Sequence, residues 1–241
     1  MQLPTPTGQL AEEQAKVQAR FDTAVKAIET FHTGVSEDML LKNAEFKELR
    51  TKLLKEAAGF YAELEKLLAG QTDAKSRKTL AKGYSQLADL TAKIGDQAQA
   101  LELHRKALAI RRELAAAPSA DIKTRLDVAR SLEKVGGHLS GIGDMTAARA
   151  ALEELRDMTE RMEAHDPTED GKVLLAHTHD LISGVLSGEG KLPEALESRA
   201  KGLALYRKLA DANPANGQFR QWQAGTYAVT AMWLTQMGKA T

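Results

Sequence analysis

The chain has 241 residues, with 33 Lys and Arg and 33 Asp and Glu, so its formal net charge is zero. This charge balance gives no electrostatic basis for binding nucleic acid or an anionic membrane. It contains no cysteine, which excludes disulfides, thiolate chemistry and cysteine-ligated zinc. Ala, Leu, Glu, Lys and Arg are frequent and aromatic residues are few, a composition that predicts an all-α fold. No apolar run approaches the roughly 20 residues that a membrane span needs, and the first residues lack the apolar core of a signal peptide.

Residues 1–35 are predicted to form a connector helix with a heptad pattern. The apolar positions alternate by four and three through Leu10, Gln14, Val17, Phe21, Ala24, Ile28 and Phe31. Three heptads are the lower limit for a coiled coil, so residues 8–33 could dimerise the chain. The equally weighted alternative is a helix that folds back and covers the exposed end of the following domain.

Residues 36–72 are predicted to hold a degenerate first repeat or a capping helix. One helix is expected over residues 44–69, with Asn43 as its N-cap. Its apolar residues again step by three and four, at Phe46, Leu49, Leu53, Ala57, Phe60, Leu64 and Leu67.

From residue 73 onward the sequence repeats. Similar turns stand at Gly95, Gly143, Gly190 and Gly238, which are 48, 47 and 48 residues apart. Five residues after the first three glycines stand Ala100, Ala148 and Ala195, and seven residues before the four glycines stand Ala88, Gly136, Ser183 and Ala231. The expected repeats are 73–120, 121–168, 169–215 and a partial 216–241, with breaks at Pro118, Pro167 and Pro214.

Each repeat is predicted to be a helix hairpin, whose first and second helices we call the A helix and the B helix. In the first repeat these should span about residues 74–94 and 97–117, roughly 30 Å each. Glycine at the turn can adopt a positive φ and end the A helix, while small residues such as Ala100 and Ala107 let the two backbones approach closely. The expected fold is therefore an all-α, right-handed superhelical solenoid of antiparallel helix hairpins, preceded by a long N-terminal helix.

This pattern of small residue, turn glycine and alanine resembles the tetratricopeptide repeat, over about residues 74–241. That motif has a period of about 34 residues, so the longer repeats here put the pitch of the superhelix in doubt but not the hairpin. The resemblance implies a scaffold that binds a protein or peptide along the concave face formed by the A helices.

A second resemblance lies upstream of the repeats, in residues 20–68. The charged helix before the V-S-E-D sequence, the L-L-K and L-R-x-x-L-L stretches and the pair Phe60–Tyr61 are similar to a segment of planctomycete-type bacterial serine/threonine kinases. In that family a kinase domain and a membrane span precede a helical connector and long tetratricopeptide-like repeats. The resemblance implies the sensor or regulatory portion of such a kinase, tethered by a span upstream. This chain itself has no Gly-rich phosphate loop, no H-R-D and no D-F-G.

No constellation in the sequence predicts an enzyme, a metal site or a cofactor. In His177-Thr-His179-Asp180 the two histidines point about 200° apart on a helix, and His179 occupies a packing position. The stretches GHLSGIGD and GVLSGEGK lack the preceding strand that phosphate loops need. Ser140 and Ser187 have no base in register with them.

The candidate partner-binding residues lie on the predicted exposed side of the A helices. They are Lys82, Gln86, Asp89, Arg130, Glu133, Lys134, His177 and Asp180. Lys82, Arg130 and His177 each stand thirteen residues before a turn glycine, so stacked repeats would align them into a ladder able to hold carboxylates. The alternative is that these are ordinary solvated charges. The predicted function is a non-catalytic protein-binding scaffold, and the second candidate is a structural module that dimerises through residues 8–33.

The last predicted A helix is apolar, with Trp222, Tyr227, Trp233 and Leu234. Terminal repeats normally carry a polar outer face. We therefore expect a truncated fragment, in preference to an end covered by another subunit.

Overall fold

The computed structural model describes residues 74–93 and 95–238, together with isolated residues between 19 and 66. The predicted N-terminal helix and dimerising heptads (1–35) and the predicted degenerate repeat (36–72) lie outside the continuously described residues. Within the described residues the protein is all-α, as predicted, with seven helices and no strand. None of these helices is both long and apolar enough to cross a membrane.

The chain divides into two compact units, Met1–Ile110 and Arg111–Thr241. The first contains α4 (Ala74–Lys93) and most of α5 (Gln97–Ala115). The second contains five complete helices: α6 (Ile122–Gly141), α7 (Met145–His165), α8 (Glu169–Gly188), α9 (Leu192–Ala212) and α10 (Gly217–Gln236). In the terms defined above, α4, α6, α8 and α10 are A helices, and α5, α7 and α9 are B helices.

Every A helix ends at a turn glycine with a positive φ. The angles are 97° at Gly95, 88° at Gly143, 79° at Gly190 and 69° at Gly238, and no other described residue has a positive φ. After Gly143 the amide of Asp144 donates to the carbonyl of Leu139 at 3.0 Å, the six-to-one bond of a Schellman ending. The amide of Lys191 makes the same bond to Leu186 at 2.8 Å. Glycine suits this position because the left-handed conformation is costly for residues that have a Cβ.

The residue after the glycine starts the B helix. Oδ1 of Asp96 accepts from the amide of Gln99 at 3.0 Å, and Oδ1 of Asp144 accepts from the amide of Ala147 at 3.1 Å. These aspartates are N-caps that satisfy otherwise unpaired amides of the first turn. In the third repeat Lys191 makes no such bond, and Pro193 stands in the first turn of α9 instead. The Gly-Asp pair thus ends one helix and begins the next.

In the first compact unit, α4 and α5 pack through alternating small and large residues. Ala81, Tyr84 and Ala88 on α4 are fully buried, as are Ala100 and Ala107 on α5. The ammonium of Lys106 on α5 lies 5.1 Å from the centre of the Tyr84 ring, a cation–π contact between the two helices.

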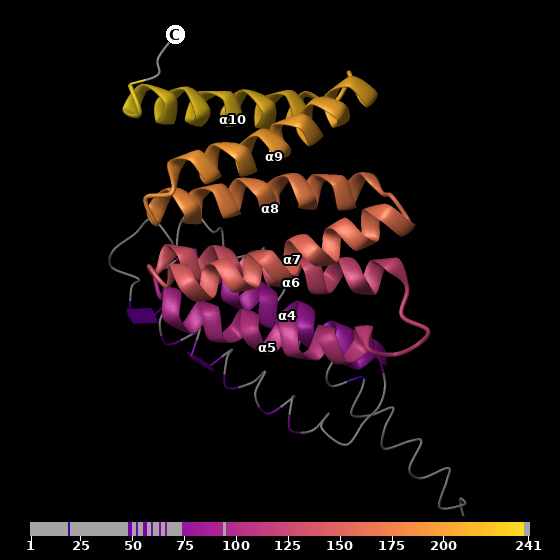
Figure 1. Ribbon diagram of the computed structural model, residues 1–241. Coiled ribbons are helices and arrows are strands. Elements are labelled where there is room, and N and C mark those ends of the chain that lie inside the picture. The colour runs from indigo at the N-terminus through magenta and orange to yellow at the C-terminus, as the bar shows by residue number, and fades with distance from the viewer. Residues whose placement is uncertain are drawn as a thin grey trace, which may run out of the picture. The chain divides into compact units, whose positions relative to one another are not determined.

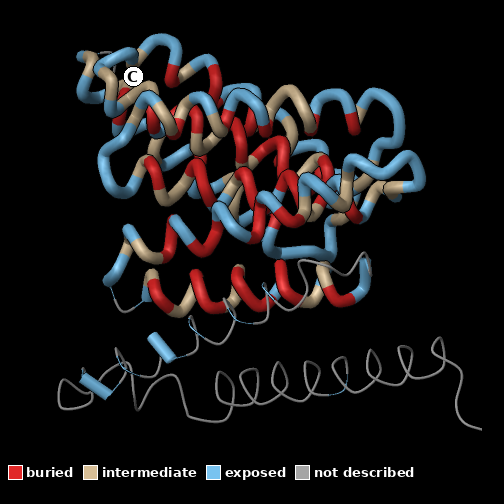
Figure 2. The backbone as a smooth tube through the Cα atoms, turned by 90° about the horizontal axis from the view of Figure 1, so that it is seen from below, coloured by how far each residue is buried: buried red, intermediate tan, exposed pale blue. Residues whose placement is uncertain are grey.

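In the second compact unit, consecutive helices pack against one another from α6 to α10, and α6 also contacts α8 past the intervening α7 (Figure 1). Buried residues line the inner sides of these helices, and exposed residues occupy their outer sides and the turns (Figure 2). Side chains at the N-terminal ends of the A helices cap them: Asp121 accepts from the amide of Thr124, Thr168 from Gly171, and Asn216 from Gln218.

The helices α6 and α7 approach each other closely at Gly136. A Cβ added to Gly136 would lie 2.6 Å from Cδ2 of Leu152, whose side chain is fully buried. Between α8 and α9, a Cβ on Gly202 would lie 3.0 Å from the carbonyl oxygen of Ala176 and 3.3 Å from Cβ of His179. Small residues therefore set the separation of the helices in each hairpin, because a larger residue would meet the partner helix.

Candidate functional site

The candidate surface is the solvent-exposed side of the A helices, which carries the predicted binding residues; we call it the outward side. In the first compact unit Lys82 is exposed on α4, while Gln86 and Asp89 are half-buried. Asp89 is engaged within the unit, because its Oδ1 lies 3.6 Å from Nε2 of the buried His104 on α5. The proposed alignment of Lys82 with the ladder residues of the second unit remains a prediction.

In the second compact unit an ion pair and a contact between a carboxylate and an imidazole join α6 directly to α8. The guanidinium of Arg130 lies 2.7 Å from Oδ2 of Asp170, and both side chains are about half exposed, at 50% and 62%. Oε1 of Glu133 lies 3.4 Å from Nδ1 of His177. The sequence groups Arg130, Glu133 and His177 on one surface; in the structure Glu133 and His177 are in contact, while Arg130 pairs with Asp170. The structure also places Asp170, in the first turn of α8, on this surface. The sequence pattern did not indicate this residue. Lys134 is exposed on the same helix as Arg130.

An aromatic cluster at α10 adjoins His177. The imidazole of His177 meets the indole of Trp222 edge-on, with ring centroids 4.7 Å apart, and lies 5.9 Å from the ring of Tyr206. Trp222 in turn packs beside Phe219, at 5.7 Å. The half-buried Trp222 places an amphipathic ring next to His177 of α8.

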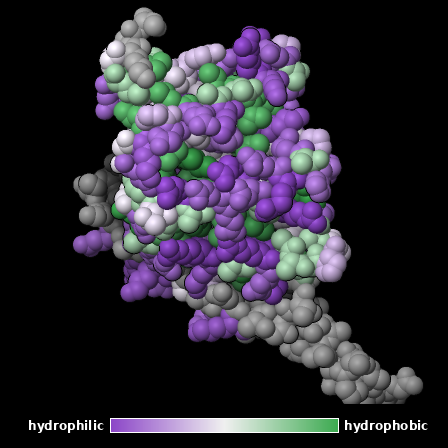
Figure 3. Space-filling model, in the orientation of Figure 1, coloured by the Kyte–Doolittle hydropathy of each residue, from purple (hydrophilic) through white to green (hydrophobic). Residues whose placement is uncertain are grey.

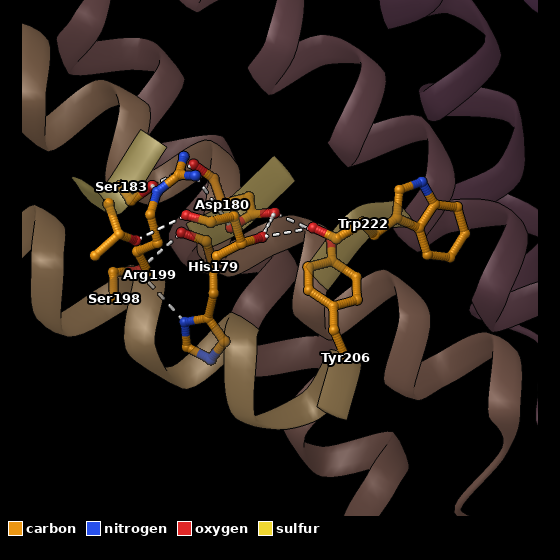
Figure 4. A network of polar contacts seen from close by, with 9 residues as sticks. His179, Asp180, Ser183, Ser198, Arg199, Tyr206 and Trp222 are labelled. Atoms are coloured by element: carbon orange, nitrogen blue, oxygen red, sulfur yellow. Dashed lines mark hydrogen bonds and ion pairs between the residues drawn. The ribbon is translucent and has the colours of Figure 1, made fainter. Parts of the chain in front are cut away.

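Asp180, the last of the predicted binding residues, connects α8, α9 and α10. Its Oδ2 accepts from the hydroxyl of Tyr206 at 3.1 Å and from Oγ1 of Thr226 at 3.5 Å. The guanidinium of Arg199 lies 3.9 Å from its Oδ1 (Figure 4). Burial raises the pKa of Asp180, while Arg199 and the two hydroxyls act in the opposite direction. This carboxylate is engaged within the protein, whereas the Arg130–Asp170 pair faces solvent.

Arg199 is an unexpected buried cation on α9, 8% exposed. Its Nε donates to Oγ of Ser183 at 3.2 Å, and its guanidinium lies 4.7 Å from the ring centre of Trp233 on α10. Burial lowers its pKa, and the charge of Asp180 offsets part of this effect. The small Ser183, which the repeat pattern requires, leaves the space that Arg199 fills.

His179 faces a different side of α8 from His177. It is 6% exposed, and Oγ of Ser198 donates to its backbone carbonyl at 2.9 Å and lies 3.4 Å from Nδ1. Burial, with the charges of Lys201 and Arg156, lowers the pKa of His179 to about 4. The two histidines therefore have separate surroundings, and no group of three or more His, Asp or Glu side chains among the described residues could hold a metal ion.

A hollow of about 400 Å³ lies on the other side of α8, between α7 and α9. Its rim carries three cations, Arg149, Arg156 and Lys201, among four carboxylates, Glu153, Glu160, Glu194 and Glu197. Charges of both signs line the hollow, so it has no strong preference for ligands of one sign.

The sequence matches no model of a known protein family and no curated protein.

Proposed function

We propose that this protein is a non-catalytic scaffold that binds a protein or peptide along the outward side of its A helices. The helix hairpins would stack as a right-handed, tetratricopeptide-like solenoid, with α6, α8 and α10 contributing neighbouring strips of the binding surface. The consecutive packing of α6 to α10 and the contact between α6 and α8 support this arrangement.

Two observations carry the proposal: the half-exposed Arg130–Asp170 pair, which joins α6 to α8, and the contact between His177 and Trp222, which joins α8 to α10. An exposed ion pair contributes little to stability, at most about 1 kcal/mol, so a ligand can displace it at small cost. A peptide carboxylate could replace Asp170 at the guanidinium of Arg130 and gain a charge-assisted hydrogen bond. An apolar side chain next to it in the peptide would meet the indole of Trp222.

By the resemblance of residues 20–68, we further propose that the scaffold is the sensor or regulatory portion of a bacterial serine/threonine kinase. The scaffold would then report the presence of its ligand to a kinase domain elsewhere in the protein. No kinase motif is present in these 241 residues, so phosphorylation would be carried out by that other domain.

An array of random peptides, probed with the 241-residue chain, tests the binding surface. The scaffold should select peptides that pair an acidic residue or a C-terminal carboxylate with an aromatic or aliphatic residue. Arg130→Glu should weaken capture of the selected peptides at least tenfold. Lys208→Glu, an equal charge change at an exposed position on the B helix α9, should leave capture unchanged.

Circular dichroism should show the same helicity for both variants. Equal capture by the Arg130→Glu variant and the unchanged protein would refute this surface as the binding site. Lys82→Glu extends the test to α4: a comparable loss would support the ladder predicted from the sequence.

The second candidate function, dimerisation through residues 8–33, comes from the heptad pattern alone. Light scattering on residues 1–241 and 36–241 distinguishes the two. A dimer that is lost on deletion favours the structural role, and a monomer in both cases argues against it.

A further inference from the structure

The open end of the α6–α7 hairpin, opposite its turn, holds another hollow, of about 480 Å³. The first turn of α6 and the C-terminal half of α7 line it, so it lies within the second compact unit. The lining residues that matter for a ligand are Ile122, Arg125, Met158, Arg161, Met162 and His165. We call this site the hairpin hollow. Its volume is within the range of about 300 to 1,000 Å³ that is typical of small-molecule sites.

The floor of the hairpin hollow is apolar. Ile122 and Met158 are half-buried there, and Met162 is buried, at 7% exposed. By contrast, hydrophilic residues cover most of the face of the molecule seen in Figure 3, with hydrophobic residues in patches between them. Methionine adapts to ligands of irregular shape, and its thioether makes favourable contacts with aromatic rings. Two methionines in one floor therefore favour a ligand that carries a ring.

Two arginines on the rim have no partner. Neither the guanidinium of Arg125 on α6 nor that of Arg161 on α7 makes a hydrogen bond or an ion pair with any described residue. Both side chains are exposed. Arg125 stands in the first turn of α6, where a cation opposes the helix dipole. Its charge therefore does not stabilise α6 and is available to a ligand.

The carboxylates that line the hairpin hollow do not cancel these cations. Nη2 of Arg112 on α5 lies 2.6 Å from Oε1 and 2.7 Å from Oε2 of Glu154, so that carboxylate is already neutralised. The other carboxylate is that of Asp166, which stands against two unpaired guanidiniums. The imidazole of His165 is a further hydrogen-bonding group on the rim. The balance of unpaired charge is positive, and this favours an anion.

We propose that the hairpin hollow binds a small organic anion in which a carboxylate is joined to an aromatic ring. The carboxylate pairs with the guanidiniums of Arg125 and Arg161, whose planar donors match its geometry. The ring lies on Met158 and Met162. This site shares no residue with the peptide-binding surface proposed above, and either function can exist without the other.

Phenylbutyrate is the probe, because it carries this carboxylate and this ring and little else. Saturation-transfer NMR with the 241-residue chain should show saturable binding to one site. For a ligand of this size we expect a dissociation constant below about 1 mM. Phenylbutyramide, which is uncharged, and butyrate, which has no ring, should each bind at least tenfold more weakly.

Substitutions assign the binding to the hairpin hollow. Arg125→Gln combined with Arg161→Gln should weaken it at least tenfold, because the carboxylate loses both charged partners. Met158→Gln should weaken it while leaving every charge in place. Arg220→Gln is the matched control, since it removes an exposed guanidinium on α10 that has no partner among the described residues, and it should leave binding unchanged. Circular dichroism should show the same helicity for all variants.

Absence of saturable binding overturns the proposal. Equal binding by the unchanged chain and by the double arginine variant, or by the Met158→Gln variant, also overturns it. Displacement of phenylbutyrate by an equal concentration of inorganic phosphate would do the same, because it would reveal an anion site that makes no use of the ring. A peptide ending in phenylalanine that binds at least tenfold more tightly than phenylbutyrate would overturn it as well, and would assign the hollow to the C-terminus of a partner protein.

Discussion

The hydroxyl of Tyr206 donates a hydrogen bond of 3.1 Å to Oδ2 of Asp180, which ties α9 to α8. Thr226 donates to the same oxygen from α10 at 3.5 Å. One half-buried carboxylate therefore links three helices of two neighbouring hairpins, and its loss should loosen the packing of α10 on the rest of the second compact unit.

Tyr206→Phe should destabilise the protein by about 1 to 3 kcal/mol, because the half-buried carboxylate of Asp180 loses its shortest donor. Oδ1 of Asp180 has no hydrogen-bond partner among the described residues, so the other oxygen cannot compensate. Urea denaturation measures the change. Tyr227→Phe is the control, since that ring is 51% exposed and its hydroxyl can bond to water. Equal effects of the two substitutions would contradict the role of Asp180.

Gly136→Ala should destabilise the α6–α7 hairpin. Overpacking costs about 1 to 3 kcal/mol, and the higher helix propensity of alanine offsets part of that cost. The new methyl group would lie 2.6 Å from Cδ2 and 2.7 Å from Cγ of Leu152. Gly137→Ala, one residue further along the same helix, has nothing within 4 Å of the added Cβ and should stabilise by about 0.5 to 1 kcal/mol. The urea midpoint measures both changes in stability. A lower midpoint for Gly136→Ala together with a higher one for Gly137→Ala would confirm the close approach at Gly136. Two changes of the same sign would argue against it.

Gly190→Ala should destabilise by about 1 to 2 kcal/mol, because φ is 79° at this turn and a Cβ is disfavoured there. Gly190→Asn should cost less, since asparagine tolerates the left-handed conformation. Gly184→Ala, in the exposed interior of α8, should instead be stabilising. The melting temperatures of the three variants test this. Equal melting temperatures for Gly190→Ala and Gly190→Asn would contradict the prediction.

Protonation of His179 should make stability depend on pH between about 6.5 and 4. The unfolded chain binds a proton at this residue near pH 6.5, whereas the folded protein does so only at about 4. The unfolded state therefore holds more protons in this window, and stability falls as the pH is lowered through it. His179→Leu, which introduces the residue found at the equivalent Leu132, should flatten this dependence.

The measurement for His179 is the difference in urea midpoint between the variant and the unchanged protein at pH 7.5, 5.5 and 4. Asp180 contributes with the opposite sign, because its folded pKa is raised and its share of the stability is lost as the pH rises. Asp180 is present in both proteins, so its contribution largely cancels in the difference. A difference that stays constant with pH would mean that the histidine titrates alike in both states.

The hairpins were predictable because the residues that define them act locally. Gly95 and Asp96 end one helix and begin the next through bonds within five residues, so their spacing along the chain is sufficient to locate the turns. The small residues at Gly136 and Ala148 are equally visible, since the repeat aligns them.

The surroundings of Asp180 and Arg199 were not predictable in the same way. A position within a repeat assigns a side chain to one face of a helix but does not say which residues of later helices reach it. Tyr206 and Thr226 stand 26 and 46 residues beyond Asp180, and Trp233 lies on the helix after Arg199. Arg199 also takes the place of His104 and Leu152 in the other B helices. A cation in a column of buried residues is a signal that could have pointed to this network.

The positive-φ glycines also mark positions at which repeats could be removed or inserted. Each hairpin enters and leaves its turn with the same backbone geometry, and the turns recur every 47 or 48 residues. A sequence cut after Gly143 and rejoined after Gly190 would lead α6 through a turn that keeps its positive-φ glycine into α9. The glycines are thus natural splice points at which one repeat length, a B helix with the A helix that follows it, can be deleted, duplicated or exchanged while the turn glycine is kept.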